Sequence, residues 1–298
     1  MTELHPAGNS VHLHMPQIPP VVLSIAGFDP CSGAGVTADI KTAAAHGCYG
    51  VASITALTVQ STQGVRRVEP VSPDLVRETL GGIAADVEIS AVRIGMLGSS
   101  KVVSAVADFL EQQKLANVVL DPILKSSSGA DLIDTAGKKL MVERLIPLAA
   151  VVTPNIDEAE AITGIAVSNP QQMRLAAEKL HELGAAAVVV TGGHLDKAIE
   201  LLTFKTRRGI EQEIFKSERQ RSNSTHGTGC AFATAMACHL AHGRGLPEAV
   251  LLAKAYVSAA IANAHPLGKG TGPVHHLYRM YQQRRQTAVI AEAESVHQ

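Results

Sequence analysis

The sequence predicts an α/β protein with a doubly wound, mostly parallel central sheet, helices on both faces and a small antiparallel hairpin at one edge. Short runs of Val, Ile, Leu and Ala alternate along the chain with helical patterns, which is typical of parallel strands joined by crossover helices. Aromatic residues make up 3% of the chain and Trp is absent. The core must therefore consist of aliphatic side chains, as in strands that are buried on both faces.

The individual elements are predicted from these runs and from the turn residues that bound them. Apolar runs predict strands at residues 21–26, 51–57, 91–95, 118–121, 150–153 and 187–191. Periodic apolar positions predict helices at residues 36–46, 73–89, 101–113, 131–145, from 157 onward, 171–183, 231–241 and 247–265. Residues 58–62 are expected to leave the second strand as a loop. Two further runs, at 201–204 and 213–215, flank Arg208-Gly209 and predict the edge hairpin.

The chain of 298 residues is expected to form one domain over residues 21–282, with a polar N-terminal tail at 1–20 and a polar C-terminal tail at 283–298. The net charge of −1 argues against a nucleic-acid partner or an anionic membrane surface. The sequence shows neither a membrane-spanning apolar run nor a signal-peptide pattern. Four cysteines without a C-x-x-C motif indicate a reducing, cytoplasmic compartment.

One stretch combines an anion-binding pattern with a potential base. Residues 224–230 read Ser-Thr-His-Gly-Thr-Gly-Cys and precede small apolar residues that predict a buried helix. Glycines let the backbone present several N–H groups to one point, and the positive end of the helix favours an anion there. Cys230 lies in the first helical turn, where the pKa of a thiol is expected to be lowered. The alternative is a closely packed helix start with a buried, inert cysteine.

A second glycine pattern, Gly33-x-Gly35-x-x-Ala38, follows the first strand and opens the first helix. Its spacing matches a dinucleotide fingerprint, but the strand at 51–57 lacks the expected acidic residue. We therefore interpret it as a loop that binds phosphate or a polar substrate. Asp39 follows on the helix, and Gln60 carries the donor and acceptor that suit the edge of a heterocycle. A solvated Asp39 and a surface Gln60 are the alternatives.

Polar side chains also lie where other predicted strands end. Asp121 is at the carboxyl end of the strand at 118–121, the edge at which open α/β sheets bind ligands. Asn155, Asp157 and Glu158 follow the next strand. Asp157 and Glu158 favour the start of a helix, and Glu158 can alternatively hold a hydrated Mg²⁺ ion.

These motifs occur in an order that resembles the ribokinase-like kinases and, within them, the hydroxymethylpyrimidine/phosphomethylpyrimidine kinases of thiamine biosynthesis. The resemblance spans about residues 21–282. The stretches that carry it are residues 25–35 with 38–42, 55–60, 95–97, 121–122, 153–158 with 161–164, 192–194 and 225–230.

The resemblance implies an ATP-dependent phosphotransferase that converts 4-amino-5-hydroxymethyl-2-methylpyrimidine to its monophosphate and then to its diphosphate, with Mg²⁺ as a cofactor. It also implies a homodimer. The residue roles that it implies are Cys230 as general base; Gly227, Thr228 and Gly229 as the anion hole; Gly27, Asp39, Gln60 and Met96 as pyrimidine contacts; Asn155 and Thr191 at the nucleotide; and Glu158 and Asp121 at the metal.

The chain departs from the family pattern at several positions. Phe28 stands where a small hydroxyl residue is common, and Cys31-Ser32 replaces the usual Ser-Gly. Lys125 lies two positions before the usual lysine, and Thr191 stands where a lysine usually precedes Gly-Gly-His. The last two changes concern contacts with the nucleotide phosphates, and Lys125 is a candidate to replace the lost charge.

Three other functions are weighed against this one. Pyridoxal kinase is an alternative because pyridoxal also carries a hydroxymethyl group on an aromatic ring, although Gln60 and Met96 favour the pyrimidine. A catalytically silent vitamin-binding regulator is a second alternative, and the presence of Cys230, Asp39 and Glu158 argues against it. A dinucleotide oxidoreductase is disfavoured by the missing acidic residue.

Overall fold

The structure is a computed structural model that describes residues 18–282 except 127, 194–197, 219 and 221. The tails predicted at 1–20 and 283–298 therefore lie almost wholly outside the described residues. His194 of the Gly-Gly-His motif lies outside them as well.

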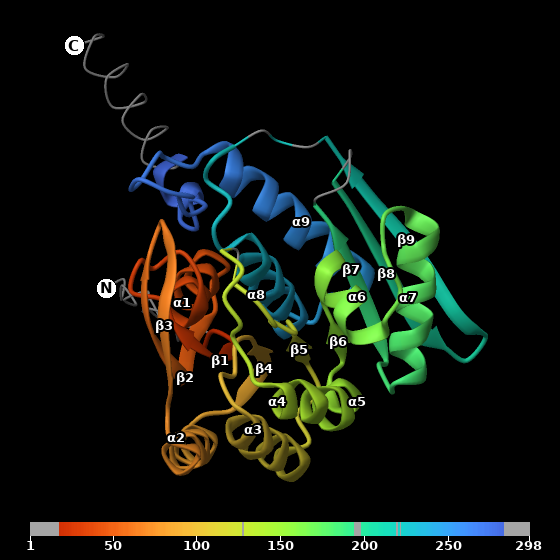
Figure 1. Ribbon diagram of the computed structural model, residues 1–298, viewed down its shortest axis with the longest axis horizontal. Helices are drawn as coiled ribbons and strands as arrows, with labels where there is room; N and C mark the ends of the chain where they lie inside the picture. The colour runs from red at the N-terminus through yellow and green to blue at the C-terminus, as the bar shows by residue number, and fades with distance from the viewer. Residues whose placement is uncertain (1–17, 127, 194–197, 219, 221, 283–298) are drawn as a thin grey trace, which may run out of the picture.

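A nine-stranded sheet crosses the described part of the chain, in the order β3-β2-β1-β4-β5-β6-β7-β8-β9 (Figure 1). Its parallel centre consists of β2 (Tyr49–Ser61), β1 (Val21–Phe28), β4 (Ile89–Ile94), β5 (Val118–Leu120), β6 (Val151–Val152) and β7 (Ala187–Gly192). Antiparallel strands complete both edges, namely β3 (Gly64–Pro70) beside β2, and β8 (Ala198–Thr206) with β9 (Gly209–Ser217) beside β7. The mostly parallel sheet and the β8–β9 hairpin were both predicted from the sequence, and both predictions are confirmed.

The prediction for residues 58–62 was wrong. β2 continues to Ser61, turns at residues 62–63 and returns antiparallel as β3, so a second hairpin forms the other edge of the sheet. The second hairpin was not predicted because β3 lacks an apolar face. Arg66, Arg67 and Glu69 are exposed, and no residue of this strand is fully buried, so its composition reads as a polar loop.

Helices cover the sheet on both faces (Figure 1). One face packs against α1 (Gly35–Ala45), α8 (Thr228–Ala241) and α9 (Leu246–Ala262). The other face packs against α2 (Pro73–Asp86), α3 (Ser100–Gln113), α4 (Thr135–Leu140), the π-helix η1 (Met141–Leu145), α5 (Ile146–Leu148), α6 (Ile156–Thr163) and α7 (Pro170–Glu182). The helix predicted at 131–145 starts only at Thr135, because the Asp134 side chain caps it by accepting from the backbone N–H of Gly137.

The innermost helix, α8, was predicted to be buried, and the prediction is confirmed. Residues 230–238 are all buried, because this helix lies between α1 and α9 against the sheet (Figure 1). Its Ala-rich sequence permits this close approach of three helices. The helix is therefore held between two helices and the sheet.

The strand order places a ligand site near the start of α8. The chain leaves β1 toward β2 on one side, and from β4 it proceeds toward β5 on the other side. The carboxyl ends of β1 and β4 thus flank the topological switch point, where doubly wound sheets bind ligands. Gly27 lies at the first of these ends, and Met96 follows the second.

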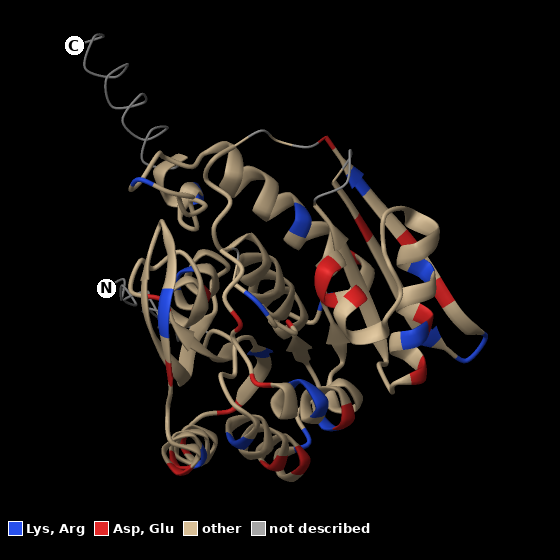
Figure 2. Ribbon diagram, viewed as in Figure 1, with Lys and Arg blue, Asp and Glu red and all other residues tan. Residues whose placement is uncertain are grey.

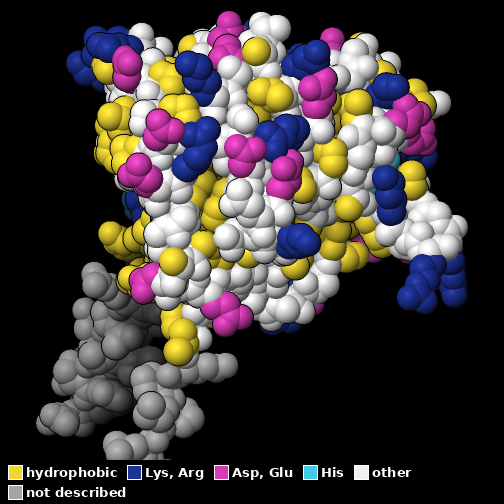
Figure 3. Space-filling model, turned by 90° about the horizontal axis from the view of Figure 1, so that it is seen from below, with side chains coloured by type: hydrophobic (Ala, Val, Ile, Leu, Met, Phe, Trp, Pro, Cys, Tyr) yellow, Lys and Arg dark blue, Asp and Glu magenta, His cyan; other side chains and the backbone are white. Residues whose placement is uncertain are grey.

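Charged side chains of both signs share the parts of the described surface seen in two views. Acidic and basic side chains are interspersed on the outer helices α2, α3 and α7 (Figure 2). The face seen from below likewise mixes apolar, acidic and basic side chains (Figure 3). In the described part of the chain, no helix combines the length and the apolar composition that a membrane span requires.

Candidate active site

A cavity of about 2060 Å³ lies at the carboxyl edge of the sheet. Sites for one drug-sized ligand usually measure about 300–1,000 Å³, so this space is large enough for two substrates. Its wall contains all but one of the residues assigned from the sequence: Gly27, Gln60, Met96, Asp121, Asn155, Glu158, Thr191, Gly227, Thr228, Gly229 and Cys230. Lys125 also lines it. The exception is Asp39.

The start of α8 presents free backbone donors to this cavity. The N–H groups of Gly229 and Cys230 have no hydrogen-bond acceptor among the described residues. Gly227 adopts a left-handed conformation, with φ of 82°, and a Cβ there would lie 1.7 Å from the carbonyl oxygen of Gly33. Only glycine fits this position, where the loop before α8 touches the loop before α1. Free amides at the N-terminus of a helix are groups that can bind an anion, so the predicted anion site stays a prediction.

The Cys230 thiol lies in the wall of the cavity and is 7% exposed. Burial raises the pKa of this thiol to about 11, although the positive charge of Arg93 and the N–H of Gly35 act in the opposite direction. The expectation of a lowered pKa was therefore wrong. The helix N-terminus is present as expected, but desolvation and the nearby carboxylates of Asp39 and Asp121 outweigh it.

A fully buried arginine organises the floor of the site. Arg93, on β4, donates to Asp39 Oδ2 at 3.1 Å and to Asp121 Oδ2 at 2.5 Å. Asp39 also accepts from Ser24 Oγ at 2.5 Å and from Thr234 Oγ1 at 2.7 Å. Asp39 is 1% exposed and faces these partners, so the structure does not place it in the cavity wall. It is neither the solvated carboxylate of the alternative nor positioned to contact a pyrimidine.

Glu158 is a further buried acid, and it lies close enough to Asp121 to feel its charge. Glu158 and Asn155 form a capping box at the start of α6, in which each side chain accepts a hydrogen bond from the other residue's backbone N–H at 2.9 Å. Burial, and then the charge of Asp121, raise the pKa of Glu158 to about 8. Burial also raises the pKa of Asp121, against the opposing effect of Arg93.

These acids fit a cation that is shared with a phosphorylated ligand. Both carboxyl groups are buried and have raised pKa values, and the positive charge of a divalent ion would stabilise their ionised forms. Within the described residues, no group of three or more His, Cys, Asp or Glu side chains has the geometry of a metal site. Mg²⁺ needs no such cage, since it is usually bound through one or two carboxylates, water and substrate phosphates.

The remaining wall lies on the side of β7 and β8. Asn155 and Thr191, both assigned to the nucleotide, are brought together in an isolated parallel bridge, and Thr191 N–H donates to the Pro154 carbonyl at 2.9 Å. Lys254 on α9 forms a buried ion pair with Glu200 on β8, and both line the cavity. Lys125 is 3.8 Å from Asp131 and largely exposed.

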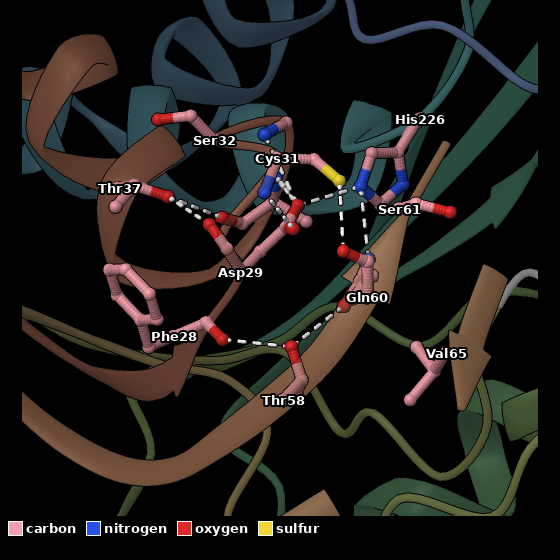
Figure 4. Close-up of polar contacts among 12 residues, drawn as sticks. Phe28, Asp29, Cys31, Ser32, Thr37, Thr58, Gln60, Ser61, Val65 and His226 are labelled. Carbon is pink, nitrogen blue, oxygen red and sulfur yellow. Dashed lines mark hydrogen bonds and ion pairs between the residues drawn. The ribbon is translucent and has the colours of Figure 1, made fainter. Parts of the chain in front are cut away.

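The loop between β1 and α1 binds a carboxylate of its own (Figure 4). Asp29 accepts backbone N–H groups from Cys31 at 2.8 Å, Gly33 at 3.1 Å and Ala34 at 2.9 Å. Burial alone would raise the pKa of Asp29, but hydrogen bonds from His226 and from these amides lower it. Because Asp29 occupies these amides, they are not free to bind phosphate, and the polar-substrate interpretation of the loop stays a prediction.

Gln60 is joined to this carboxylate through His226 (Figure 4). His226 Nε2 lies 2.8 Å from Asp29 Oδ2 and 3.3 Å from Gln60 Nε2. Gln60 Oε1 also accepts from Thr58 Oγ1 at 3.1 Å. Gln60 is thus part of a polar network in the cavity wall and not an isolated surface side chain.

Sequence reasoning missed Arg93, Asp29 and His226 as site residues. A signal existed for each one. Arg93 interrupts an apolar strand, and an arginine there must be paired if it is buried. Asp29 and His226 lie within the two glycine-containing loops that were already assigned to ligands. These two residues are 197 positions apart in sequence, so only the fold reveals that they pair with each other.

Comparison with known proteins agrees with this geometry. The profile of the phosphomethylpyrimidine kinase family matches residues 29–275. The chain is 44% identical to the thiamine biosynthesis bifunctional protein ThiED of Geobacter sulfurreducens, over 86% of this chain and 52% of that protein, so it spans about half of that relative. It is 38% identical to the hydroxymethylpyrimidine/phosphomethylpyrimidine kinase of Haemophilus influenzae, over 86% of this chain and 96% of the relative.

A solved structure supports the fold. The ADP complex of Bacillus subtilis pyridoxal kinase is similar with a TM-score of 0.79 and 32% identity, and the match covers 88% of this chain and 99% of that structure. The extended family match, the near-complete coverage of the Haemophilus relative and the shared fold lead to one conclusion: the chain belongs to the phosphomethylpyrimidine kinase family.

Proposed function

We propose that the protein is an ATP-dependent kinase that phosphorylates 4-amino-5-hydroxymethyl-2-methylpyrimidine to its monophosphate and then to its diphosphate. The observation that carries the proposal is the position of the Gly227–Cys230 loop. Its free amides at the start of α8 line the same large cavity as Gln60 and Asn155. The Haemophilus relative is a hydroxymethylpyrimidine/phosphomethylpyrimidine kinase, and this relative and the matching family support the choice of acceptor.

The acceptor is proposed to lie against Gly27, Gln60 and Met96. Gln60 offers a donor and an acceptor to a heterocycle edge, and the Met96 sulfur gives an apolar, polarisable surface for a ring. Gly27 keeps this wall open, because a Cβ there would lie 2.9 Å from the sulfur of Met96. Asp39 is proposed to act indirectly, by holding Arg93 beneath Cys230.

Cys230 is proposed to take the proton of the acceptor hydroxyl. With a pKa of about 11 its thiolate is scarce at neutral pH, but it is a strong base once formed. Arg93 and the Gly35 N–H stabilise the thiolate locally. The free amides of Gly229 and Cys230, in the loop that Gly227 and Thr228 shape, are proposed to stabilise negative charge on the transferring phosphoryl group.

The nucleotide is proposed to lie on the opposite side of the cavity, against Asn155 and Thr191. Glu158 and Asp121 would hold Mg²⁺, which, when bound, would neutralise charge on the phosphates. Lys125, which lines the cavity from a loop, is proposed to contribute a positive charge to the same phosphates. Lys254 and Glu200 neutralise each other and hold β8 against α9.

The enzyme is further proposed to act as a cytoplasmic homodimer. All four cysteines are free thiols, which suits a reducing compartment. Ile54, Leu57 and Val59 on β2 are 36%, 50% and 45% exposed, and exposed apolar side chains on one strand suit a contact between copies. Light scattering should give the mass of a dimer for the wild type and of a monomer for the Leu57→Asp variant. A monomeric wild type would contradict the proposed homodimer.

The function is tested by measuring ADP release with three acceptors in parallel: hydroxymethylpyrimidine, its monophosphate and pyridoxal. We expect both pyrimidines to support turnover, with pyridoxal much poorer. Pyridoxal kinase activity is the alternative, because the Bacillus subtilis pyridoxal kinase has the same fold. It requires pyridoxal to support faster turnover than either pyrimidine. No turnover with any of the three would favour a silent vitamin-binding protein.

A further inference from the structure

Arg93 has more hydrogen-bond donors than its carboxylate partners use. Its guanidinium carries five N–H groups and keeps its positive charge. Nη1 donates to Asp39 and Nη2 to Asp121, whereas Nε is buried and has no acceptor among the described residues. The side chain is fully buried and yet lines the cavity. Because a buried donor without an acceptor is costly, Arg93 is ready to bond an acceptor that forms beside it during the reaction.

The Cys230 side chain is the group that can become this acceptor. Burial acts to lower the pKa of Arg93, but its acidic neighbours raise it, and the Cys230 thiol is one of them, through its charge and through a hydrogen bond. A neutral thiol is a weak acceptor, whereas a thiolate accepts charge-assisted hydrogen bonds. Ionisation of Cys230 therefore gives the spare N–H groups of Arg93 a strong partner.

The charge of the floor opposes this ionisation. Three other elements contribute charged groups that act on Cys230: Arg93 lies on β4, Asp39 on α1 and Asp121 just after β5. One guanidinium cannot neutralise two carboxylates, so these groups leave one negative charge in the floor. A thiolate would add a second negative charge at a buried position, which is unfavourable.

Of the two carboxylates in the floor, Asp121 is the one that a ligand can reach. Asp39 is enclosed, because Ser24 and Thr234 donate to its two oxygens and it does not line the cavity. Asp121 lines the cavity and accepts from Arg93. A cation that enters the cavity therefore meets the charge of Asp121, and it changes the balance of charge around Arg93.

We propose that Arg93 is a positioning residue that links cation binding at Asp121 to the ionisation of Cys230, so that the base forms mainly when the metal site is filled. With a cation at Asp121 the floor is no longer negative, and the charge of Arg93 acts on the thiolate. The S–H bond breaks, the proton leaves to water in the cavity, and the thiolate accepts from Arg93. The inference rests on the proposed function, in which Asp121 is a metal ligand and Cys230 the base.

The test measures how fast iodoacetamide alkylates Cys230, with the modified peptide quantified by mass spectrometry. The thiolate is the reactive form, so the rate reports its population. The samples are wild type, Asp121→Asn and Asp157→Asn, each with and without Mg²⁺ at constant ionic strength. Asn keeps the shape of Asp121 and an acceptor for Arg93, but not the charge. Asp157→Asn is the matched control, because it removes the same charge from an exposed side chain in the cavity wall that does not bond Arg93.

Removing or compensating one neighbouring charge shifts an ionisation by about one pH unit or more. Without metal, Asp121→Asn should therefore react about tenfold faster than wild type at the same pH, and Mg²⁺ should accelerate wild type by a similar factor. Asp157→Asn should behave as wild type. The rates are followed against pH, because easier access to the thiol would raise them by the same factor at every pH, up to the plateau, whereas stronger ionisation moves the whole curve to lower pH. Equal curves for Asp121→Asn and Asp157→Asn would overturn the inference.

A second measurement reports on Arg93 itself in the wild-type protein. At about pH 10, the guanidinium hydrogens of Arg93 should resonate further downfield in Mg²⁺-loaded wild type than in Mg²⁺-loaded Cys230→Ala, because the thiolate accepts from them. Identical resonances would show that Arg93 does not bond the thiolate and would contradict its role. Neither measurement uses an acceptor, so absent turnover with all three acceptors would refute the proposed function separately from this inference.

Discussion

The role of Cys230 makes the sharpest kinetic prediction. With a thiol pKa of about 11, the thiolate fraction at pH 7 is ~10⁻⁴ and rises about tenfold with each pH unit below the pKa. If this thiolate takes the proton of the hydroxymethyl group, the rate of the first phosphorylation should rise with the same slope. The second acceptor, a phosphate monoester with a second pKa of about 6, is already ionised and needs no base.

The assay is single-turnover phosphorylation of both acceptors at saturating ATP, from about pH 7 to 9.5. The quantity followed is the rate of the first phosphorylation divided by the rate of the second. Titration of Glu158, with a pKa of about 8, affects both steps and cancels in this ratio. We expect this ratio to rise by about tenfold per pH unit in wild type. In Cys230→Ala, the first phosphorylation should fall by ~10²–10⁴-fold and the pH slope of the ratio should disappear.

Two results would refute this reasoning. A ratio that does not change with pH in wild type would mean that no base with a high pKa is involved. Equal losses on both acceptors in Cys230→Ala would mean that Cys230 acts through the geometry of the α8 start. A side-chain substitution leaves the backbone amides of the proposed anion site in place, so a strong loss of the second step would mean that Cys230→Ala has displaced these amides.

Three further predictions follow from the same network. Arg93→Met leaves Asp39 and Asp121 unpaired and should destabilise the fold by about 3–5 kcal/mol in urea unfolding; lowering the pH should reduce this loss because the carboxylates become protonated, and a loss independent of pH would count against it. The pKa of Glu158 is raised in the fold, so its stabilising effect is present below its ordinary pKa of 4.5 and is lost as the pH rises through about 8. Glu158→Gln should therefore be the more stable form at about pH 9 and should weaken the Mg²⁺ dependence of turnover; unchanged Mg²⁺ dependence would remove Glu158 from the metal site. Gln60→Ala should raise the KM for hydroxymethylpyrimidine by about five- to a hundredfold and leave the KM for ATP nearly unchanged, whereas a shift in the ATP value would place Gln60 at the nucleotide.

The sequence predicted the parallel centre of the sheet because those strands are buried on both faces. Runs such as residues 118–120 and 187–190 are almost entirely aliphatic, and few other structures bury such runs. The edge strand β3 was missed for the converse reason, since its side chains are polar and exposed. Apolar patterns in a sequence report which side chains are buried. The strand β3 is instead defined by its backbone hydrogen bonds to β2, which leave no such pattern.

The site was predictable where a short motif contains its own chemistry. The Gly227–Cys230 loop is local, and the free amides at the start of α8 follow from its glycines. Asp39 and the thiol pKa of Cys230 were not predictable in this way. Both depend on Arg93, which comes from a distant strand and converts a carboxylate that looks exposed in the sequence into a buried ion pair. Desolvation is a property of the packed fold.

The central claim is that one cavity carries out two successive phosphorylations of the same pyrimidine. The most direct measurement is mass spectrometry of the products formed from hydroxymethylpyrimidine, Mg²⁺ and excess ATP, sampled over time. The account predicts that the monophosphate appears first and is then converted to the diphosphate, with two ADP released per pyrimidine. Accumulation of the monophosphate as the only product, or phosphorylation of pyridoxal in preference to the pyrimidine, would contradict it.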